Sequence, residues 1–356
     1  MARALRLASR GWGRVHPNPL VGAVLIRDGI LVGEGFHAEF GGPHAEAMAL
    51  AAAGDLARGA TMCVTLEPCA HTGKQPPCAD ALIAAGVSRV VLAIADPNPA
   101  AQGGAERLRA AGVDVATGLC AAEAATQNAR FLHAFRGAGR PYVALKLATS
   151  IDAKIADPEG RSRWISGPEA REYVHWLRAG FDAIAVGGRT AAMDDASLTV
   201  RGTVEPRVPP VRVIFDRSLQ LAPTSVLART ARNHRTIVFA DPGRMPMGRN
   251  LAGLGVELHP ADDLAGALRT LDGLGIGSIL VEGGGRLAGA LVEDGAVDRF
   301  YWIQSPLLLG DAAVPAFAGL RTTPLASAGR WTVVERRSLG ADSLLVLDRE
   351  PCLPES

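Results

Sequence analysis

A small set of residues near the N-terminus has the types and the order of a catalytic metal site. His44 and Glu46 lie two positions apart, and Cys69 and Cys78 follow them. One imidazole and two thiolates leave the fourth tetrahedral position of a zinc ion free for water, as in catalytic zinc sites. Glu46 then stands where a carboxylate can take a proton from that water and deliver it to a leaving amine. The pattern predicts a zinc site that deaminates a nucleobase.

Each of these residues has a simpler interpretation when it is taken alone. His44 could be an ordinary helix residue, and Cys69 and Cys78 could be small buried apolar residues. The combination in this order favours zinc catalysis. One departure concerns the spacing, because the general deaminase pattern has two residues between the thiolates whereas residues 70–77 separate them here. The longer loop could make the pattern accidental, or it could mark a subfamily.

The composition is that of a globular enzyme large enough for two domains. The 356 residues are 48% hydrophobic, and 37 basic against 36 acidic residues give a net charge of +1. This balance argues against a general nucleic-acid-binding or membrane-surface role. The five cysteines are odd in number, so we expect no disulfide framework and a cytoplasmic location. We also expect no secretory signal and no membrane span.

The spacing of apolar residues predicts a first α/β unit that would position the metal ligands. Helices are expected at 1–10, 44–53, 79–85, 105–111 and 122–135, and strands at 21–26, 30–32, 61–66 and 90–95. Pro43 precedes His44 and is consistent with a helix start. His44 and Glu46 would therefore lie in the first turn of one helix, and Cys69 would follow a strand.

A second α/β unit is expected after a linker at 137–141, which contains two glycines and a proline. Strands are expected at 142–148, 183–186, 211–215, 236–239 and 278–281, with helices at 168–179 and 287–292. Such short apolar strands predict a largely parallel sheet with helices on both faces. Residues 283–285 are three glycines between a strand and a helix, where backbone N–H groups can bind phosphate. Taken alone, this run is better explained as a tight turn, since it lacks the dinucleotide-binding spacing.

Longer motifs add a resemblance to one enzyme family. The segment 65–78, Thr-Leu-Glu-Pro-Cys-Ala-His-Thr-Gly-Lys-Gln-Pro-Pro-Cys, closely resembles the bifunctional riboflavin-biosynthesis deaminase/reductases. Further similar segments lie at 16–24, 96–99, 146–148, 162–165, 194–195, 198–201 and 281–285. The resemblance covers nearly the whole chain, and its first half is the more specific part.

The resemblance implies an α/β protein with two different domains. An N-terminal cytidine-deaminase-like α/β/α domain is implied at 1–140, followed by a dihydrofolate-reductase-like α/β domain at 141–353. The first would use Zn²⁺ to deaminate 2,5-diamino-6-ribosylamino-4(3H)-pyrimidinone 5′-phosphate. The second would use NADPH to reduce the ribosyl group of 5-amino-6-(5-phosphoribosylamino)uracil to ribityl. The enzyme would thus be a hydrolase and an oxidoreductase that act on small pyrimidine ribosyl phosphates.

The resemblance also assigns residues to each site. In the deaminase, His44, Cys69 and Cys78 would bind zinc, Glu46 would be the proton donor, and Asn18, His37 and Lys74 would contact the substrate. In the reductase, the implied substrate-binding residues are Ser162, Arg178, Leu198, Arg201 and Glu282. The implied NADPH-binding residues are Ala148, Trp164, Thr190, Asp194, Arg217, Gly284, Gly285, Arg286, Leu287, Ala288, Gly289 and Ala290. Asp194 is in addition a candidate for assisting proton transfer during the reduction.

Several of these residues also have structural interpretations. Asn18 could be a turn residue between two prolines, Lys74 a solvated loop charge, and Trp164 a core residue. Arg178 and Arg201 could be surface charges, although a guanidinium suits a ribose phosphate. The chain departs from the family pattern at Ala153 and Ala196, where glycine and proline are usual, and at Arg217, which appears as an extra residue.

Two other hypotheses for the whole chain remain open from the sequence. The protein could be a deaminase whose C-terminal domain binds nucleotide without reducing it. It could instead be a zinc-stabilised nucleotide-binding scaffold with no catalysis. A nucleic-acid-editing deaminase is disfavoured by the net charge and by the low aromatic content of 5%. We expect small-molecule substrates, no nucleic-acid or membrane partner and, from the resemblance, a homo-oligomer.

Overall fold

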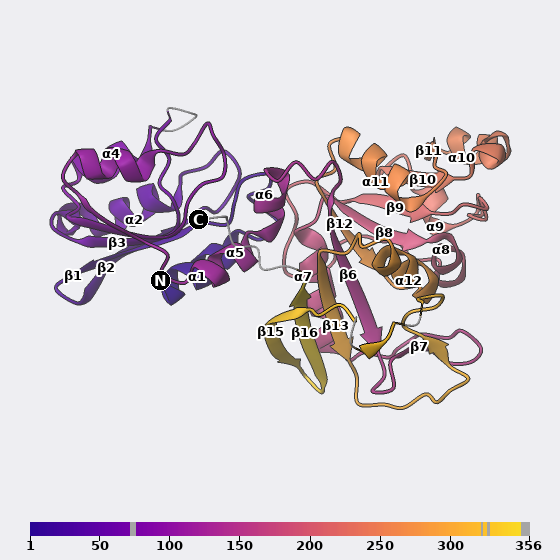
Figure 1. The fold of residues 1–356 in the computed structure, drawn as a ribbon. Helices are drawn as coiled ribbons and strands as arrows, with labels where there is room; N and C mark the ends of the chain where they lie inside the picture. The colour runs from indigo at the N-terminus through magenta and orange to yellow at the C-terminus, as the bar shows by residue number, and fades with distance from the viewer. Residues whose placement is uncertain (72–75, 322, 326–327, 350–356) are drawn as a thin grey trace. The chain divides into compact units, whose positions relative to one another are not determined.

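Two units make up the structure, a computed structural model that describes residues 1–71, 76–321, 323–325 and 328–349. Unit 1 comprises Met1–Gly137, and unit 2 comprises Ala138–Glu350. Figure 1 shows that each unit has its own β-sheet with helices packed on it.

Unit 1 contains one five-stranded sheet in the order β2-β1-β3-β4-β5. Its strands are β1 (Gly22–Arg27), β2 (Ile30–Phe36), β3 (Thr61–Leu66), β4 (Arg89–Ile94) and β5 (Asp114–Thr117). β1 pairs antiparallel with β2 and β3, whereas β3, β4 and β5 run parallel. The helices and 3₁₀ turns are α1 (Ala2–Ala8), η1 (Ser9–Gly11), α2 (Ala45–Ala53), η2 (Gly54–Ala57), α3 (Cys78–Ala84), α4 (Gly104–Ala110), α5 (Ala121–Gln127) and α6 (Ala129–Ala134).

Helix α2, which starts beside His44, packs unusually close to strand β2. A Cβ atom added at Gly33 would lie 2.3 Å from the carbonyl oxygen of Ala49, and one at Gly35 would lie 2.5 Å from that of Ala45. Only glycine therefore permits this approach. The small residues of α2 and the glycines of β2 together set the position of the first turn of α2.

The expected single helix at 122–135 is instead two helices, because α5 ends at Gln127 and α6 begins at Ala129, with Asn128 between them. The Asn128 side chain accepts from the N–H of Leu20 at 2.8 Å and donates to the Leu20 carbonyl at 3.0 Å. An asparagine that bonds backbone groups in this way competes with helix continuation. The break fixes the segment that precedes β1, which carries Asn18.

Unit 2 contains a nine-stranded sheet in the order β11-β10-β9-β8-β12-β6-β13-β16-β15 and a two-stranded sheet of β14 and β7. Its strands are β6 (Tyr142–Thr149), β7 (Lys154–Ala156), β8 (Ala183–Gly187), β9 (Val211–Phe215), β10 (Thr236–Ala240), β11 (Glu257–Pro260), β12 (Ser278–Glu282), β13 (Arg299–Gln304), β14 (Val314–Pro315), β15 (Thr332–Leu339) and β16 (Asp342–Asp348). The helices and the 3₁₀ turn are α7 (Pro168–Ala179), α8 (Gly188–Asp194), α9 (Val226–Arg229), η3 (Pro242–Gly248), α10 (Arg249–Gly253), α11 (Leu264–Gly273) and α12 (Gly285–Glu293).

The large sheet has two apolar faces, as its short apolar strands predict. Ala183, Ala185 and Val213 belong to one buried cluster, which also contains residues of α11 and α12. The intervening strand residues Ile184 and Ile214 belong to a second cluster with residues of α9 and α10. This alternation places helices on both faces of a mainly parallel sheet. The antiparallel pairs described in this sheet, β13 with β16 and β16 with β15, lie together at one edge.

The strand order creates a crevice at the carboxyl ends of the central strands. The chain passes from β6 to β8, continues outward to β11, and returns to place β12 between β8 and β6. Neighbouring parallel strands whose connections leave in opposite directions open such a crevice, where α/β proteins bind ligands. Ala148, Gly187 and Glu282 all lie at this edge of the sheet.

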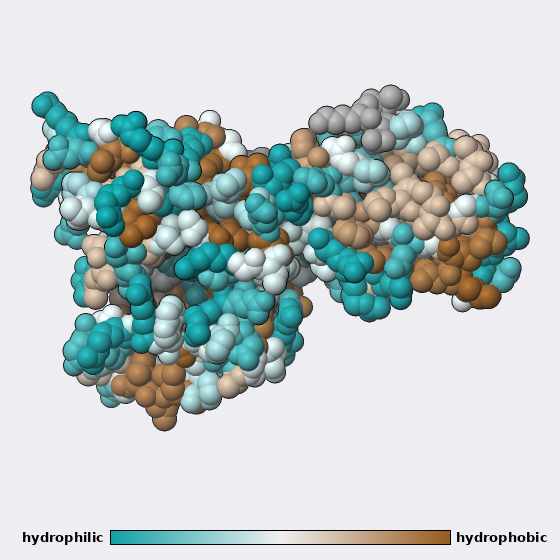
Figure 2. All heavy atoms as spheres, turned by 180° about the vertical axis from the view of Figure 1, so that it is seen from behind, coloured by the Kyte–Doolittle hydropathy of each residue, from teal (hydrophilic) through white to brown (hydrophobic). Residues whose placement is uncertain are grey.

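The surface of unit 2 also carries an apolar cluster. Figure 2 shows it at the tip formed by the loop between β13 and β14, where Leu308 is 72% exposed. Ile151, which is also exposed, donates its N–H to the Leu307 carbonyl in the same loop. Among the residues that the structure describes, no helix is long and apolar enough to cross a membrane.

Candidate active sites

The three predicted metal ligands of unit 1 converge. His44 immediately precedes α2, Cys69 follows β3, and Cys78 opens α3. His44 Nδ1 lies 3.2 Å from Cys78 Sγ and 3.7 Å from Cys69 Sγ, and all three ligand atoms lie within 4.8 Å of one another. Zinc–ligand bonds of ordinary length in a tetrahedron separate such atoms by roughly 3.5–3.8 Å. The donor set therefore fits a zinc ion in both chemistry and size.

The thiols carry a further sign of a cation site. Hydrogen bonding from Cys78 and from the His44 ring, set against burial, lowers the pKa of Cys69 to about 4. The same contact with Cys69, together with burial, raises the pKa of Cys78. The shifts are opposite because the two thiols interact, so that one deprotonates more readily than the other. A divalent cation between them would favour the thiolate form of both.

Glu46 lies in the first turn of α2 and is buried. Burial raises the pKa of its carboxyl group to about 7, against the opposing effects of its backbone hydrogen bond and of His44. A carboxyl group with such a pKa can both accept and donate a proton near neutral pH. Its position beside the three ligands gives the proton acceptor and donor that hydrolytic deamination needs.

Asn18 and His37 also lie at this site. His37 Nδ1 donates to the Pro43 carbonyl at 3.0 Å, so in the neutral ring Nε2 accepts from Asn18 Nδ2 at 3.1 Å. Burial lowers the pKa of His37, which favours this neutral form. The His37 and His44 rings are 5.6 Å apart. Lys74, the third predicted substrate contact, lies outside the described residues.

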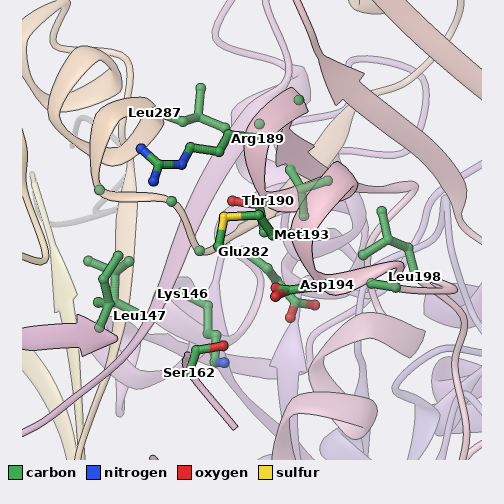
Figure 3. A pocket seen from close by; sticks show the side chains of 18 of the residues that line it. Lys146, Leu147, Ser162, Arg189, Thr190, Met193, Asp194, Leu198, Glu282 and Leu287 are labelled. Carbon is green, nitrogen blue, oxygen red and sulfur yellow. The ribbon is translucent and has the colours of Figure 1, made fainter. Parts of the chain in front are cut away.

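In unit 2, the crevice at the carboxyl ends of the strands is a cavity of about 1750 Å³. Figure 3 shows side chains from β6, β12, α8 and the neighbouring loops pointing into it. All five predicted substrate-binding residues line the cavity, as do ten of the predicted cofactor residues: Ala148, Trp164, Thr190, Asp194, Arg217, Gly284, Gly285, Arg286, Leu287 and Ala290.

Ala288 and Gly289 are the exceptions, since neither lines the cavity. Ala288 is fully buried, and a Cβ atom added at Gly289 would lie 2.5 Å from the carbonyl oxygen of Ala318. Helix periodicity explains the difference, because Leu287 and Ala290 share one face of α12 while the two residues between them face the interior. The N-terminus of α12 itself opens toward the cavity through Gly284 and Gly285.

The glycine run before α12 is required by the backbone. Gly283 and Gly284 have φ of 66° and 82°, in the left-handed region that favours glycine. A Cβ atom at Gly284 would also lie 2.9 Å from Thr190 Oγ1. The turn therefore brings the N–H groups at the start of α12 next to α8, in an arrangement suited to an anionic ligand.

A buried ion pair forms the floor of the cavity. Arg178 on α7 donates to both carboxylate oxygens of Glu282, at 2.5 and 3.0 Å. Burial alone would raise the pKa of Glu282, but the charge and hydrogen bonds of Arg178 hold it below its ordinary value. The half-buried Lys146 ammonium also lines the cavity, and its pKa is lowered by desolvation while the Glu282 charge opposes the shift. The cavity therefore contains two ionisable groups, Lys146 and Glu282, whose pKa values are both shifted by their surroundings.

Lys146, His175, Arg189 and Met193 line the cavity and were not assigned a role from the sequence. Lys146 carried a usable signal, because it is the single charge within an otherwise apolar strand at 142–148. His175 carried none, since it lies on a polar helix and the fold alone brings it to the cavity.

The structure places all three departures from the family pattern. Ala153, where glycine is usual, has a φ of 57°, which is strained for alanine. Arg217 is exposed, lines the cavity and lies 4.0 Å from Asp241, so its guanidinium is available to an anionic ligand. Ala196 lines the cavity beside Asp195, whose φ of 40° is also left-handed.

Comparison with known proteins agrees with the division into a deaminase and a reductase domain. Residues 1–94 match the model of the cytidine and deoxycytidylate deaminase zinc-binding region, and residues 141–345 match that of the RibD C-terminal domain. The riboflavin biosynthesis protein RibD of Escherichia coli is 41% identical, with 98% of each chain covered. The chain belongs to the RibD family.

Solved RibD structures share the fold over nearly the full length. RibD of Acinetobacter baumannii is 39% identical with a TM-score of 0.81, covering 98% of this chain and 97% of that one. A deaminase/reductase of Thermotoga maritima is 37% identical with a TM-score of 0.82 over the same shares. Membership of the RibD family makes this chain a bifunctional riboflavin-biosynthesis enzyme, with a zinc-binding deaminase domain and an NADPH-using reductase domain. The expected cytidine-deaminase-like domain and the C-terminal reductase domain are thereby confirmed.

Proposed function

We propose that residues 1–140 deaminate 2,5-diamino-6-ribosylamino-4(3H)-pyrimidinone 5′-phosphate. Residues 141–353 then reduce the ribosyl group of 5-amino-6-(5-phosphoribosylamino)uracil to ribityl. The Thermotoga maritima relative is a diaminohydroxyphosphoribosylaminopyrimidine deaminase and 5-amino-6-(5-phosphoribosylamino)uracil reductase by name. In this chain, the observation that carries the proposal is the convergence of His44, Cys69 and Cys78 beside a buried carboxyl group.

In the deaminase site, His44, Cys69 and Cys78 hold the metal. Zinc bound by three protein ligands supplies a water whose pKa is close to 7. Glu46 accepts a proton at its carboxylate and delivers it to the departing amine, a role that its raised pKa suits. His37 holds Asn18 in place, and the Asn18 amide contacts the pyrimidinone edge. Lys74 contributes a positive charge for the substrate's polar groups.

In the reductase site, substrate and cofactor occupy opposite ends of the cavity. Arg178 and Arg201 provide positive charge for the ribose phosphate, and Ser162, Leu198 and Glu282 complete the substrate end. NADPH supplies the hydride, and the start of α12 with Thr190 and Arg217 binds its phosphates. Ala148, Trp164 and Asp194 contact the rest of the cofactor.

Proton transfer during the reduction has two candidate groups. Lys146 and Glu282 both line the cavity, and burial lowers the pKa of Lys146 while the Glu282 charge opposes that shift. Burial also raises the pKa of Asp194, which leaves it able to hold a proton. We assign Asp194 the assisting role and place Lys146 with it as a second donor.

Family membership favours the two-activity enzyme over a deaminase with an inactive C-terminal domain and over a non-catalytic zinc scaffold. Metal analysis, with mass spectrometry of the products formed from the diaminopyrimidinone phosphate with and without NADPH, tests the choice. We expect one bound zinc, a deaminated product without NADPH, and a ribityl product with it. A deaminated product alone in both reactions would leave the reductase proposal without support.

The same proposal extends to the ligands, the oligomeric state and the cellular location of the enzyme. Its ligands are small pyrimidine ribosyl phosphates, and neither nucleic acid nor a membrane is a partner. We propose a homo-oligomer in the cytoplasm, which sedimentation analysis of the purified enzyme would test.

A further inference from the structure

The loop at 195–201 carries two of the reductase residues that face the substrate, Leu198 and Arg201. It has no regular secondary structure and adopts left-handed backbone angles at Asp195 and Leu198, with φ of 40° and 49°. Neither residue is glycine, so the loop does not favour this conformation by itself. Contacts from outside the loop must hold it.

Helix α7 supplies two of these contacts from one face. Arg178 Nη1 donates to the Thr199 carbonyl at 2.9 Å, and the N–H of Arg201 donates to His175 Nδ1 at 3.2 Å. His175 and Arg178 are three positions apart, which places them side by side on the helix. Arg178 also donates to Glu282, so it has a second partner outside the loop. His175, in contrast, accepts from the backbone of Arg201 itself, the residue whose side chain lines the cavity.

The His175 ring is in the right protonation state for this contact. An Nδ1 atom that accepts a hydrogen bond is unprotonated, so the neutral ring carries its proton on Nε2. Burial and the charges of Arg178 and Arg201, opposed by Glu282 and by a backbone hydrogen bond with Thr199, lower the pKa of His175 to about 4. Across the physiological range the ring thus accepts the Arg201 N–H.

We propose that His175 is a positioning residue of the reductase, which holds the backbone of Arg201 so that its guanidinium meets the phosphate of the substrate. This inference rests on the proposed reductase function and names a residue that the family resemblance did not. Its consequence is selective. His175 controls affinity for the phosphorylated substrate, whereas the cofactor end of the cavity, at Thr190 and the start of α12, is independent of it.

Three variants of the full-length enzyme test the proposal. His175→Leu removes the acceptor, and His175→Asn restores an acceptor near the position of Nδ1. His259→Leu is the matched control, because His259 lies on β11 in the same unit and does not line the cavity. Each variant is assayed for KM of the aminouracil phosphate, KM of NADPH, kcat, and inhibition by inorganic phosphate, with deaminase activity as an internal control.

We expect His175→Leu to raise the KM of the phosphorylated substrate about tenfold, the size expected for one lost hydrogen bond, and to weaken phosphate inhibition similarly. NADPH KM and deamination should change less than about twofold, and His175→Asn should recover most of the loss. An unchanged substrate KM in His175→Leu would overturn the proposal. Equal losses for substrate and NADPH with a lowered unfolding midpoint would show a merely structural role. A wild-type enzyme that does not oxidise NADPH would instead contradict the proposed function.

Discussion

Glu46 shows how burial adapts a single carboxyl group to a reaction. Its position in the first turn of α2 is fixed by the close packing of that helix on β2. The same burial raises its pKa to about 7. The position of Glu46 and its raised pKa therefore have one cause, the close packing of α2 on β2 that the glycines permit.

Glu46→Gln removes the titrating group but keeps its size and leaves the three ligand atoms in place. We expect full zinc content and a loss of deamination of at least about 10²-fold, since general acid–base catalysis contributes that much. NADPH oxidation with the deaminated substrate should be unchanged. Metal analysis and the two activity assays on one preparation provide the measurement. Loss of zinc in this variant would show instead that Glu46 is needed to keep the metal bound.

Ala153 carries backbone strain that a single change can relieve. Its φ of 57° costs an alanine about 1–2 kcal/mol, and glycine returns part of this as chain entropy in the unfolded state. We expect Ala153→Gly to raise the free energy of unfolding by about 0.5–1 kcal/mol in denaturant titrations. Ala156→Gly in strand β7 is the control and should lower it. A destabilised Ala153→Gly protein would refute the strain argument.

His175 provides a pH-dependent contribution to stability with a definite sign. Its folded pKa of about 4 lies below the ordinary value of 6.5, so the fold favours the neutral ring. The contribution is complete above pH 6.5 and is lost as the pH falls toward 4. Burial, Arg178 and Arg201 disfavour the charged ring, and Glu282 and the Thr199 backbone partly oppose them. The stability difference between wild type and His175→Asn should shrink over this range in unfolding titrations, and a difference independent of pH would contradict the shift.

At the scale of elements, the edge hairpin of β15 and β16 is tied to the helix that carries His175 and Arg178. Buried Asp342, at the start of β16, accepts from the N–H of Gly167 at 2.7 Å, where α7 begins. The antiparallel edge of an otherwise parallel sheet thus determines where α7 starts. The segment just before α7 includes Trp164, which lines the cavity.

Asp342→Ala should therefore destabilise unit 2 and disturb its ligand site. A charge-assisted hydrogen bond to a buried N–H contributes about 1.5–3 kcal/mol, and we expect a loss of that size in denaturant unfolding. The KM of NADPH should rise, because Trp164 loses its support. Ser343→Ala, at the exposed neighbouring position, is the matched control. Equal behaviour of the two variants would show that Asp342 does not anchor α7.

At the scale of the whole molecule, the two chemistries use separate sets of residues. The metal ligands all belong to unit 1, and every residue that lines the reductase cavity belongs to unit 2. Each unit has its own sheet and its own buried residues. One activity can therefore be removed while the other persists.

Removal of zinc with a chelator tests this independence. We expect deamination to be abolished, and reduction of the separately supplied deaminated substrate to continue within about twofold of the untreated rate, because no described cavity residue is a metal ligand. Added zinc should restore deamination. Parallel loss of both activities on chelation would mean that the reductase depends on the folded metal site.

Much of this molecule was predictable from local sequence. The order His44, Glu46, Cys69 and Cys78 indicated zinc chemistry because ligand type and spacing are local properties. Apolar strands of four to seven residues likewise indicated a parallel sheet covered on both faces. The eight residues between the thiolates, which departed from the general deaminase pattern, pointed to the family to which the chain belongs.

Only the tertiary structure determined the contacts between distant segments. The two-helix break at Asn128, the inward-facing Ala288 and Gly289, and the strained Ala153 depend on neighbours far away in sequence. The roles of Lys146 and His175 depend on which strands and loops meet at the crevice. The chemistry of the metal ligands follows from residue type and order. The pKa shifts, the backbone strain and the supporting contacts follow from burial and packing, which no local sequence pattern contains.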